Sequence, residues 1–528
     1  MMANLTTSVS FDKQGFVLNA SVDELTAENT DLRRENQVLQ HQLEWFKRQL
    51  FGEKSEQRLI DVPPEQGQLF AAGSSGALPA PEATVIPAHQ RRKKQRAPDD
   101  VLDSGLRFTE DVPVRVIDRT PEALRGAGAE DYVILSYDST YRLAQRVGSY
   151  EVLEYRTPRY KLNGEASIHH VPAPANVLEN SCVDVSLLAG LLVDKFAYHL
   201  PIHRQHQRLK DAGITVSRSS LLNWCGRAIE LLEPIVYTQY QSILTSRVLG
   251  MDETPVKAGK AKTKGKMKQG YLWPMVGDQD EVVFHFNPSR GSKVIQEQLG
   301  KQFDGVLLCD GYVAYKTYAE NKDNNVTLAN CWSHSRRKFE AVKTIDPLAC
   351  EEALQLIGAL YHNEAHIRDH ELEGQTKLDY RTQHSEPIVK QFWQWCEAQQ
   401  QRPDLFPKHP LQKALNYVLE RIEPLQVFLS DPDVPLDTNH VERALRGIPL
   451  GRKNWMFCWT EMGARHVGII QSLIVTCRLH GVNPYQYLVD VLQRIAVHPA
   501  KQVEELTPRL WKTQFANAPM LSDVSRER

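Results

Sequence analysis

The chain has 528 residues, of which 41% are hydrophobic, and its formal net charge is −2 at pH 7. A chain of this length exceeds one ordinary domain and predicts several, with enough apolar residues for real cores. The near-zero net charge excludes a uniformly basic nucleic-acid-binding protein, so any contact with nucleic acid has to come from local basic clusters.

The cysteines and the apolar stretches favour a soluble cytoplasmic protein. The eight cysteines form no CxxC pair, and scattered thiols of this kind are typical of a reducing compartment. The first twenty residues lack the charged start and apolar stretch of a secretory signal. The longest aliphatic run, at 187–193, is too short to span a bilayer, so we expect no membrane partner.

The N-terminal part of the chain divides into three stretches. Residues 1–20 are expected to be disordered. Residues 21–52 repeat apolar side chains at heptad positions, which predicts a short leucine-zipper-like coiled coil and a homo-oligomer; the alternative is a single amphipathic helix. Residues 53–104 are rich in Pro, Gly, Ala and Ser and predict a flexible linker that ends in a basic arm, HQRRKKQRAP. The arm either lies along DNA phosphates or is a solvated run of charges.

Two smaller regions are predicted next. Residues 105–173 alternate apolar and polar side chains in short runs, which indicates a small β-rich module. Residues 174–240 are helical, with one helix stopped by Gly213 and a second that begins after Ser217, a plausible N-cap. The pattern is that of a helix-turn-helix with Arg218 as a DNA contact, although many helical hairpins have the same pattern.

The second half of the chain predicts an α/β fold. Over 241–345, three strands, a helix, another strand and a further strand with its helix give a mixed sheet covered by helices. Residues 346–436 are polar and helical, which indicates an all-helical insertion. Residues 437–500 hold a helix with Glu442, a short strand RKNWMFCW and two C-terminal helices, and residues 501–528 form a tail.

Asp252 and Asp310 occupy equivalent places, because each follows a buried apolar run and precedes a residue that breaks the strand. Ligands of such sheets lie at the carboxyl ends of the strands, so we expect the two side chains to lie close together. Two adjacent carboxylates repel each other unless a divalent cation binds them, and Mg²⁺ prefers oxygen ligands. Glu442 supplies a third carboxylate and allows a second ion, as in two-metal chemistry.

Each of these carboxylates also has a simpler interpretation. An aspartate at a strand end is often a turn former. Glu253 competes with Asp252, and because successive strand residues face opposite sides, we favour Asp252 as the first acid after the buried run. Glu442 follows Asn439 by three residues, and an N-cap at Asn439 would form a capping box with it.

Basic side chains are expected around this site. His334 either orients a phosphate or a water near the metals, or packs on its strand-to-helix turn. Cys331 and His334 have half of a zinc-site spacing but no partner pair, so zinc is not expected. Lysines crowd residues 257–268, a predicted hairpin tip that either clamps DNA or is solvated. The candidate phosphate contacts are Arg336, Arg337, Lys338, Arg443, Arg446, Arg452 and Lys453.

Five motifs resemble, in order, the transposases of bacterial insertion sequence family 66: MDETPV, CDGYVAY, CWSHSRRKF, TNHVERALRGIPLGRKNWMF and SLIVTCRLHGVNPYQYLVDVL. The resemblance covers roughly 21–56 and 174–500. It implies an RNase H-like core with a DDE triad on Asp252, Asp310 and Glu442, interrupted by a helical insertion. It also implies cleavage at the element's ends with Mg²⁺ (or Mn²⁺), and transfer of the freed 3′-hydroxyl into target DNA.

The resemblance further implies partners and a location. These are the element's terminal inverted repeats, target DNA, small accessory proteins of the same element, and the nucleoid. Residues 105–173 depart from the family, because they lack the CxxC pairs of its zinc-finger-like module, and the family's zinc is therefore not carried over. The alternative hypothesis is a catalytically inactive DNA-binding regulator or relic of a transposase. A coiled-coil assembly protein would leave the strand-end aspartates unexplained.

Overall fold

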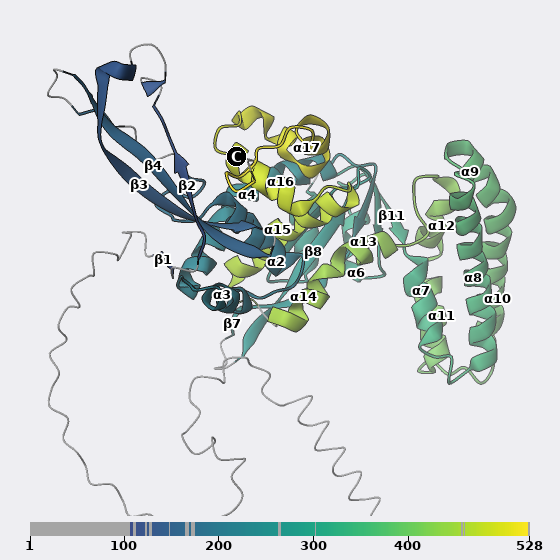
Figure 1. Ribbon diagram of the computed structural model, residues 1–528. Coiled ribbons are helices and arrows are strands. Elements are labelled where there is room, and N and C mark those ends of the chain that lie inside the picture. The colour runs from purple at the N-terminus through teal and green to yellow at the C-terminus, as the bar shows by residue number, and fades with distance from the viewer. Residues whose placement is uncertain are drawn as a thin grey trace, which may run out of the picture. The chain divides into compact units, whose positions relative to one another are not determined.

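The computed structural model describes residues 106–525, except for gaps at 109–111, 122–123, 126–128, 147, 164–167, 171–174, 262–265, 301–302, 456–457 and 459 (Figure 1). The chain divides into two units, Met1–Lys94 and Gln95–Arg528, and every described residue belongs to the second. The predicted coiled coil at 21–52 and the linker with its basic arm at 53–104 lie outside the described residues, as do residues 1–20. Within the described ranges, none of the helices combines the length and the hydrophobicity needed to cross a bilayer.

Alternating side chains produce a three-stranded sheet near the start of the described chain (Figure 1, blue). Its strands are β2 (Val114–Asp118), β3 (Tyr132–Arg146) and β4 (Ser149–Leu162). β3 and β4 form an antiparallel hairpin around Gly148, whose φ of 81° suits glycine, and β2 pairs with β4 in parallel. Leu143 of β3 and Val152 of β4 are fully buried near this turn, so apolar packing anchors the sheet there.

The C-terminal stretch, which was expected as a tail, packs against the same sheet. It contains the 3₁₀ helix η5 (Ala500–Leu506) and the helix α17 (Pro508–Gln514). The Tyr155 hydroxyl donates a hydrogen bond to Asp523 at 2.8 Å, and Val524 packs beside Tyr155 in a small buried cluster. These contacts make the C-terminal stretch part of the folded unit.

Three helices follow the first sheet. They are α2 (Val185–Phe196), α3 (Ile202–Asp211) and α4 (Arg218–Ile243). Both predicted helix limits are confirmed: Gly213 has a φ of 77° just after α3, and Ser217 Oγ accepts from the Ser220 amide at 3.0 Å as the N-cap of α4. A short sheet of β1 (Arg107–Phe108) and β5 (Ile214–Thr215) lies at this turn.

The central sheet is mixed, as predicted. Its strands are β6 (Val248–Met251), β7 (Thr254–Lys260), β8 (Met267–Val276), β9 (Val282–Asn287), β10 (Gly305–Cys309) and β11 (Val326–Asn330). β6, β10 and β11 are parallel, whereas β8 is antiparallel to β6, β7 and β9. β6 and β7 pair with successive stretches of β8, so they behave as one strand interrupted at Asp252 and Glu253. The order across the sheet is β9, β8, β6 with β7, β10 and β11.

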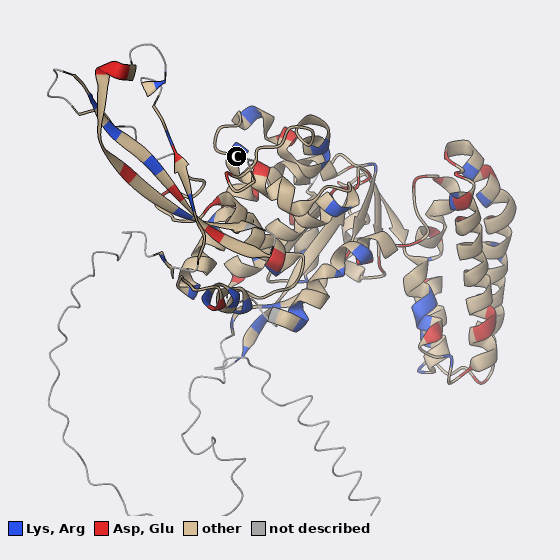
Figure 2. Cartoon of the chain, in the orientation of Figure 1, with Lys and Arg blue, Asp and Glu red and all other residues tan. Residues whose placement is uncertain are grey.

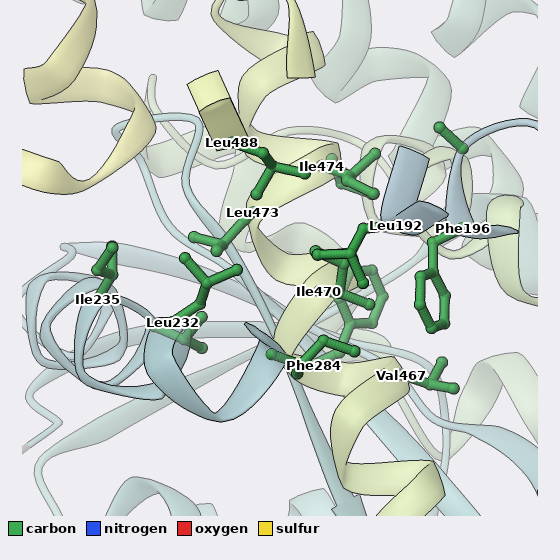
Figure 3. Close-up of a cluster of buried hydrophobic side chains, with 14 of the residues drawn as sticks. Leu192, Phe196, Leu232, Ile235, Phe284, Val467, Ile470, Leu473, Ile474 and Leu488 are labelled. Atoms are coloured by element: carbon green, nitrogen blue, oxygen red, sulfur yellow. The ribbon is translucent and has the colours of Figure 1, made fainter. Parts of the chain in front are cut away.

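Side chains of the sheet alternate between two cores. Leu307 and Cys309 of β10 face the larger core, whereas Val306 and Leu308 face the second one. The helices of the larger core (Figure 3) include α2, α4, α15 (Glu461–Leu479) and α16 (Pro484–Arg494). The second core is built mainly by the helical insertion. Helices from distant parts of the chain therefore cover both faces of the sheet.

Helical side chains satisfy the outer backbone groups of the edge strand β9. Ser472 Oγ and Thr476 Oγ1 of α15 accept from the amides of Phe284 and Val282 at 2.9 and 3.1 Å. Gly468 permits this approach, because a Cβ there would lie 2.4 Å from the Phe284 carbonyl oxygen. α15 thus takes the place of a further strand and closes this edge.

The region predicted as a helical insertion consists of helices in the structure. α7 (Trp332–Glu340) leads from β11 toward it. The helices are α8 (Pro347–Asp369), α9 (Gly374–Tyr380), the π-helical turn η4 (Arg381–Ser385), α10 (Glu386–Gln400), α11 (Pro410–Leu419) and α12 (Ile422–Ser430). Trp332 is fully buried and packs against Phe392 of α10, which ties the sheet to the insertion.

Arg381 is a fully buried arginine inside the insertion. Its guanidinium donates two hydrogen bonds to the Glu364 carboxylate, both at 2.8 Å. It also donates to the carbonyl oxygens of Phe428, Asp431 and Val434 at 2.6, 3.0 and 3.2 Å. These three carbonyls belong to the last turns of α12 and to the segment that follows it, so a single side chain holds this part of the chain in place.

After the insertion, the chain forms α13 (Asn439–Leu445) and α14 (Gly447–Trp455). The predicted strand RKNWMFCW was wrong, because its first residues belong to α14. Cys458 forms an isolated bridge with Ala258, and its amide donates to the Lys257 carbonyl at 2.8 Å. A short aromatic run of this kind does not distinguish a helix from a strand.

All eight cysteine side chains are buried. Burial raises the pKa of the Cys225 and Cys458 thiols to about 11. These two groups are therefore protonated at neutral pH, in a state that reacts slowly with electrophiles.

Candidate active site

The strands β6 and β10 bring Asp252 and Asp310 to the same edge of the sheet. The two strands are parallel neighbours, and Gly250 pairs with Leu308 in their register. Asp252 and Asp310 each lie two residues beyond this pair, so both follow the carboxyl end of their strand at the same level. The sequence predicted this arrangement from the apolar runs that precede the two aspartates.

The helix α13 carries Glu442 to the same region. A Cβ on Gly250 would lie 2.6 Å from Val441 and 3.0 Å from His440, so the absence of a side chain at Gly250 lets α13 approach β6 closely. Burial, together with the charges of Glu253, Asp310 and Glu442, raises the pKa of Asp252 to about 7. The three predicted carboxylates therefore lie near enough to act on one another electrostatically.

Glu442 lies against two side chains of α7. Both of its oxygens accept from Arg337 Nη2 at 2.5 Å, and His334 Nε2 lies 3.7 Å from Oε1. His334 and Arg337 are one turn apart on α7, so they face Glu442 together. The capping box was wrong: Thr438 is the N-cap of α13, and the Asn439 amide donates to Asp437. A charged guanidinium binds a carboxylate more strongly than a single backbone N–H does.

Glu253 and Asp252 point to different partners. The Glu253 carboxylate accepts from Arg290 Nε at 2.8 Å and from the Tyr315 hydroxyl at 2.9 Å, and its side chain is 3% exposed. Burial raises the pKa of Glu253, and the charge of Asp310 acts in the same direction. Asp252 Oδ1 accepts from the Glu253 amide at 2.7 Å. Burial therefore disfavours the charge of both carboxylates, and Glu253 is the one that pairs with Arg290.

The predicted basic residues have several different environments. Arg443, Arg446 and Lys453 line a groove of about 540 Å³ together with Glu442, and blue marks basic residues on α14 and β7 in Figure 2. Arg218 is exposed at the first turn of α4. The others have protein partners: Arg336 pairs with Glu340, Arg337 pairs with Glu442, Lys338 lies over the Tyr417 ring, and Arg452 donates to the Pro255 carbonyl.

Two features of the site were not predicted from the sequence. The first is the role of Arg337 as the partner of Glu442, although the three-residue spacing from His334 already placed both on one helix face. The second is the contact of Arg421 and Tyr417, from the insertion, with Gly311. No sequence signal indicates that contact, because the two segments are 110 residues apart.

Carboxylate oxygens are the ligands that hard divalent cations prefer. Within the described residues, no three His, Cys, Asp or Glu side chains are grouped closely enough to hold one metal ion. The carboxylate of Glu442 is paired with Arg337, and this pairing is one reason why the three carboxylates are not grouped around one point. The donor chemistry of the site fits Mg²⁺ or Mn²⁺, provided that Glu442 exchanges Arg337 for the ion.

Comparison with protein families agrees with the motifs. Residues 180–466 match the model of the IS66 transposase family, residues 472–509 match the IS66 C-terminal element, and residues 38–117 match a model described as transposase C of IS166 homeodomain. The longest match is to DDE transposases of insertion sequences. The chain belongs to the IS66 transposase family, which confirms the resemblance seen in its motifs.

Individual relatives extend over most of the chain. The uncharacterized protein y4hP of Sinorhizobium fredii is 28% identical over 518 residues, which cover 92% of this chain and 90% of y4hP. The uncharacterized protein y4jD of the same species is 32% identical over 372 residues, or 67% of this chain and 71% of y4jD. The Drosophila P element transposase strand transfer complex aligns with a TM-score of 0.32 and 12% identity, over 57% of this chain and 93% of that one.

Proposed function

We propose that this protein is an active transposase that cleaves DNA at the ends of its insertion element and transfers the freed 3′-hydroxyl into target DNA. The observation that carries the proposal is that Asp252 and Asp310 follow the ends of two neighbouring parallel strands, while the charges of Asp310 and Glu442 both raise the pKa of Asp252. Such mutual repulsion is costly without a cation, and family membership supports the same three residues as the DDE triad.

Asp252 and Asp310 would hold divalent cations at the strand ends, and Glu442 would join them after it leaves Arg337. When bound, Mg²⁺ or Mn²⁺ would activate the attacking oxygen and stabilise the leaving oxygen of the phosphodiester. Arg337 neutralises Glu442 beforehand and, once released, offers its guanidinium to a DNA phosphate. His334, on the same helix face, orients a phosphate or a water beside the site.

The strand order supports an RNase H-like core, as the family resemblance implies. The interrupted strand β6 with β7, then β8 and β9, form the antiparallel part, and β10 and β11 add the parallel part. Asp252 and Asp310 follow the two strands that meet at the centre of this order. The helical insertion separates them in sequence from Glu442, yet the charge of Glu442 still raises the pKa of Asp252.

The DNA partners are the element's terminal inverted repeats and the target. The groove beside Glu442, with Arg443, Arg446 and Lys453, has the charge and position to hold a phosphate backbone. Arg218 in the helix-turn-helix-like region is a second DNA contact in this proposal. The coiled coil at 21–52 would join copies of the protein, which would act with small accessory proteins of the same element.

DNA cleavage should require a divalent cation. We expect nicking of an end-labelled terminal repeat in the presence of Mg²⁺ or Mn²⁺, no nicking after addition of EDTA, and recovery when the cation is returned, because the carboxylates cannot act on a phosphate without it. Denaturing gels measure the nicked strand, and a scrambled duplex of equal length is the control. The repeats are found as inverted sequences in the DNA that flanks the gene.

The alternative function, a catalytically inactive DNA-binding regulator or relic, gives a different result in the same assay. Such a protein would retain the terminal repeat in a binding assay and would leave it intact with every cation tested. Retention without nicking by the unaltered protein would therefore contradict the proposed activity.

Arg446 is expected to contact a DNA phosphate. Arg446→Ala should lower affinity about equally for all sequences and should flatten the slope of log affinity against log salt by about one unit. Fluorescence anisotropy at several salt concentrations measures both quantities. Arg465→Ala is the matched control, because Arg465 is also exposed but pairs with Glu233 and is not among the residues that line the groove. An unchanged slope would make Arg446 an ordinary surface residue.

A further inference from the structure

The turn that follows Asp310 is held by the helical insertion. Arg421, between α11 and α12, donates from Nη2 to the Gly311 carbonyl oxygen at 2.9 Å and from Nη1 to the Tyr417 carbonyl oxygen at 2.6 Å. Its guanidinium also lies over the Tyr417 ring, 4.1 Å from the ring centroid. Arg421 of the insertion is therefore hydrogen-bonded to the backbone directly after Asp310, a proposed metal ligand.

The side chains of Arg421 and Tyr417 lie in close contact with Gly311. A Cβ on Gly311 would lie 2.5 Å from Arg421 Nε and 2.5 Å from the Tyr417 hydroxyl. The ammonium group of Lys338 also lies over the Tyr417 ring, 4.6 Å from its centroid, so the ring is held by two cations. The Gly311 backbone therefore cannot move toward Arg421 and Tyr417 unless these side chains shift as well.

The sheet fixes the same turn through different groups. Asn330 Nδ2, at the end of β11, donates to the Asp310 carbonyl oxygen at 3.0 Å. The Tyr312 amide donates to Asp310 Oδ1 at 2.8 Å. Two successive carbonyl oxygens therefore accept hydrogen bonds: that of Asp310 from the sheet and that of Gly311 from the insertion. Without the second bond, an open groove of about 630 Å³, lined by Asp310, Gly311 and Arg421 among others, gives the turn room to move.

We propose that Arg421 and Tyr417 are positioning residues for Asp310, so that the helical insertion sets where this carboxylate meets Asp252. The inference rests on the proposed function, in which Asp310 binds a divalent cation. Arg421 and Tyr417 touch neither the cation nor DNA in this scheme. They act through the Gly311 backbone, which they hold against the repulsion between the two aspartates.

The test compares Arg421→Ala, Arg421→Lys and the control Lys413→Ala, an exposed position on α11. Electron paramagnetic resonance of unbound Mn²⁺ measures the affinity of the DNA-free protein for the ion. We expect Arg421→Ala to weaken Mn²⁺ binding about tenfold or more, as is usual when a residue behind a metal ligand is lost. Lysine keeps a charged donor group but not the planar fork of the guanidinium, so Arg421→Lys should recover part of the affinity.

The rate of DNA cleavage is a second measurement on the same variants. Under single-turnover conditions with saturating protein, Arg421→Ala should cleave the terminal repeat about tenfold to a hundredfold more slowly, because a small displacement of a ligand costs this much. Its affinity for the repeat should stay within about twofold of that of the unaltered protein, since no phosphate contact is lost. If Arg421→Ala fails to fold by circular dichroism, Gly311→Ala replaces it, because the added methyl group displaces Arg421.

The outcomes separate this inference from the proposed function. Unchanged Mn²⁺ affinity and unchanged cleavage in Arg421→Ala, with both lost in Asp310→Asn, would overturn the positioning role and keep the triad. Weaker DNA binding with normal Mn²⁺ affinity would also overturn it, since Arg421 would then be a DNA contact. Normal Mn²⁺ affinity and cleavage in Asp310→Asn would remove the proposed function itself, and this inference with it.

Discussion

Asp310→Asn is expected to reduce cleavage of the terminal repeat by about 10⁴-fold or more while DNA affinity stays close to that of the unaltered protein. The amide has almost the same shape as the carboxylate, but it lacks the negative charge that binds a cation. Asp252→Asn and Glu442→Gln should have effects of the same order. When residues act as a unit, the loss of any one of them removes most of the activity. Single-turnover cleavage on denaturing gels and anisotropy with the same DNA measure the two quantities.

The thermal stability of the metal-free protein provides an independent test of Asp252→Asn. The pKa of Asp252 is raised to about 7 by burial and neighbouring charges, whereas an unfolded aspartate has a pKa of about 3.9. The protonated form is therefore favoured by folding, and this stability is lost as the pH rises through about 7. Asparagine has no proton to lose, so Asp252→Asn should melt at least about 2 °C above the unaltered protein near pH 8, with a smaller difference at lower pH.

Two results would contradict the triad. Equal cleavage by the unaltered protein and by all three variants would show that these carboxylates do not act on the phosphodiester. Loss of cleavage together with a lower melting temperature in all three would point to folding, not to chemistry. Glu253→Gln is the matched comparison, because this neighbouring carboxylate pairs with Arg290 and is expected to affect stability more than the chemical step.

Arg381→Ala is expected to destabilise the helical insertion by about 3–5 kcal/mol, the usual result when one partner of a buried charge pair is removed. The truncation leaves the buried side of the Glu364 carboxylate and three backbone carbonyls without their donor. It also leaves a cavity where a large side chain was fully buried. In urea, monitored by tryptophan fluorescence, the unfolding midpoint should fall by about 1 M or more.

The control for this substitution is Arg368→Ala in the same insertion. The Arg368 side chain is 75% exposed, so its removal should change the free energy of unfolding by no more than about 0.5 kcal/mol. Hydrogen exchange adds a local reading, since the segment 428–434 should exchange faster in Arg381→Ala. Equal urea midpoints for the two variants would show that the buried bonds of Arg381 contribute little.

The sequence predicted the parts of the site that depend on local pattern. Apolar runs followed by an acid and a strand breaker identified Asp252 and Asp310, because a buried strand and its end are visible in a few consecutive residues. The N-cap Ser217 and the stop at Gly213 were predicted for the same reason. The mixed sheet followed from the order of strands and helices along the chain.

The parts that could not be predicted depend on contacts between distant segments. Glu442 and Arg337 are 105 residues apart, and the capping-box pattern at Asn439 gave a local alternative that the charge pair displaced. The segment 452–459 was misassigned because a short aromatic run fits either a helix or a strand. The clamp of Arg421 on Gly311 depends on how the insertion packs, which no local pattern specifies.

The burial of every native cysteine has a practical consequence for mapping the path of DNA. A maleimide or a cross-linking reagent requires an accessible thiolate, and protonated thiols in the interior react slowly. A single cysteine introduced on the surface, for example at Lys453 or Arg218, would then be labelled in preference to the native eight. Fluorophores or DNA tethers attached there would report distances within an assembled protein–DNA complex without prior removal of the native thiols.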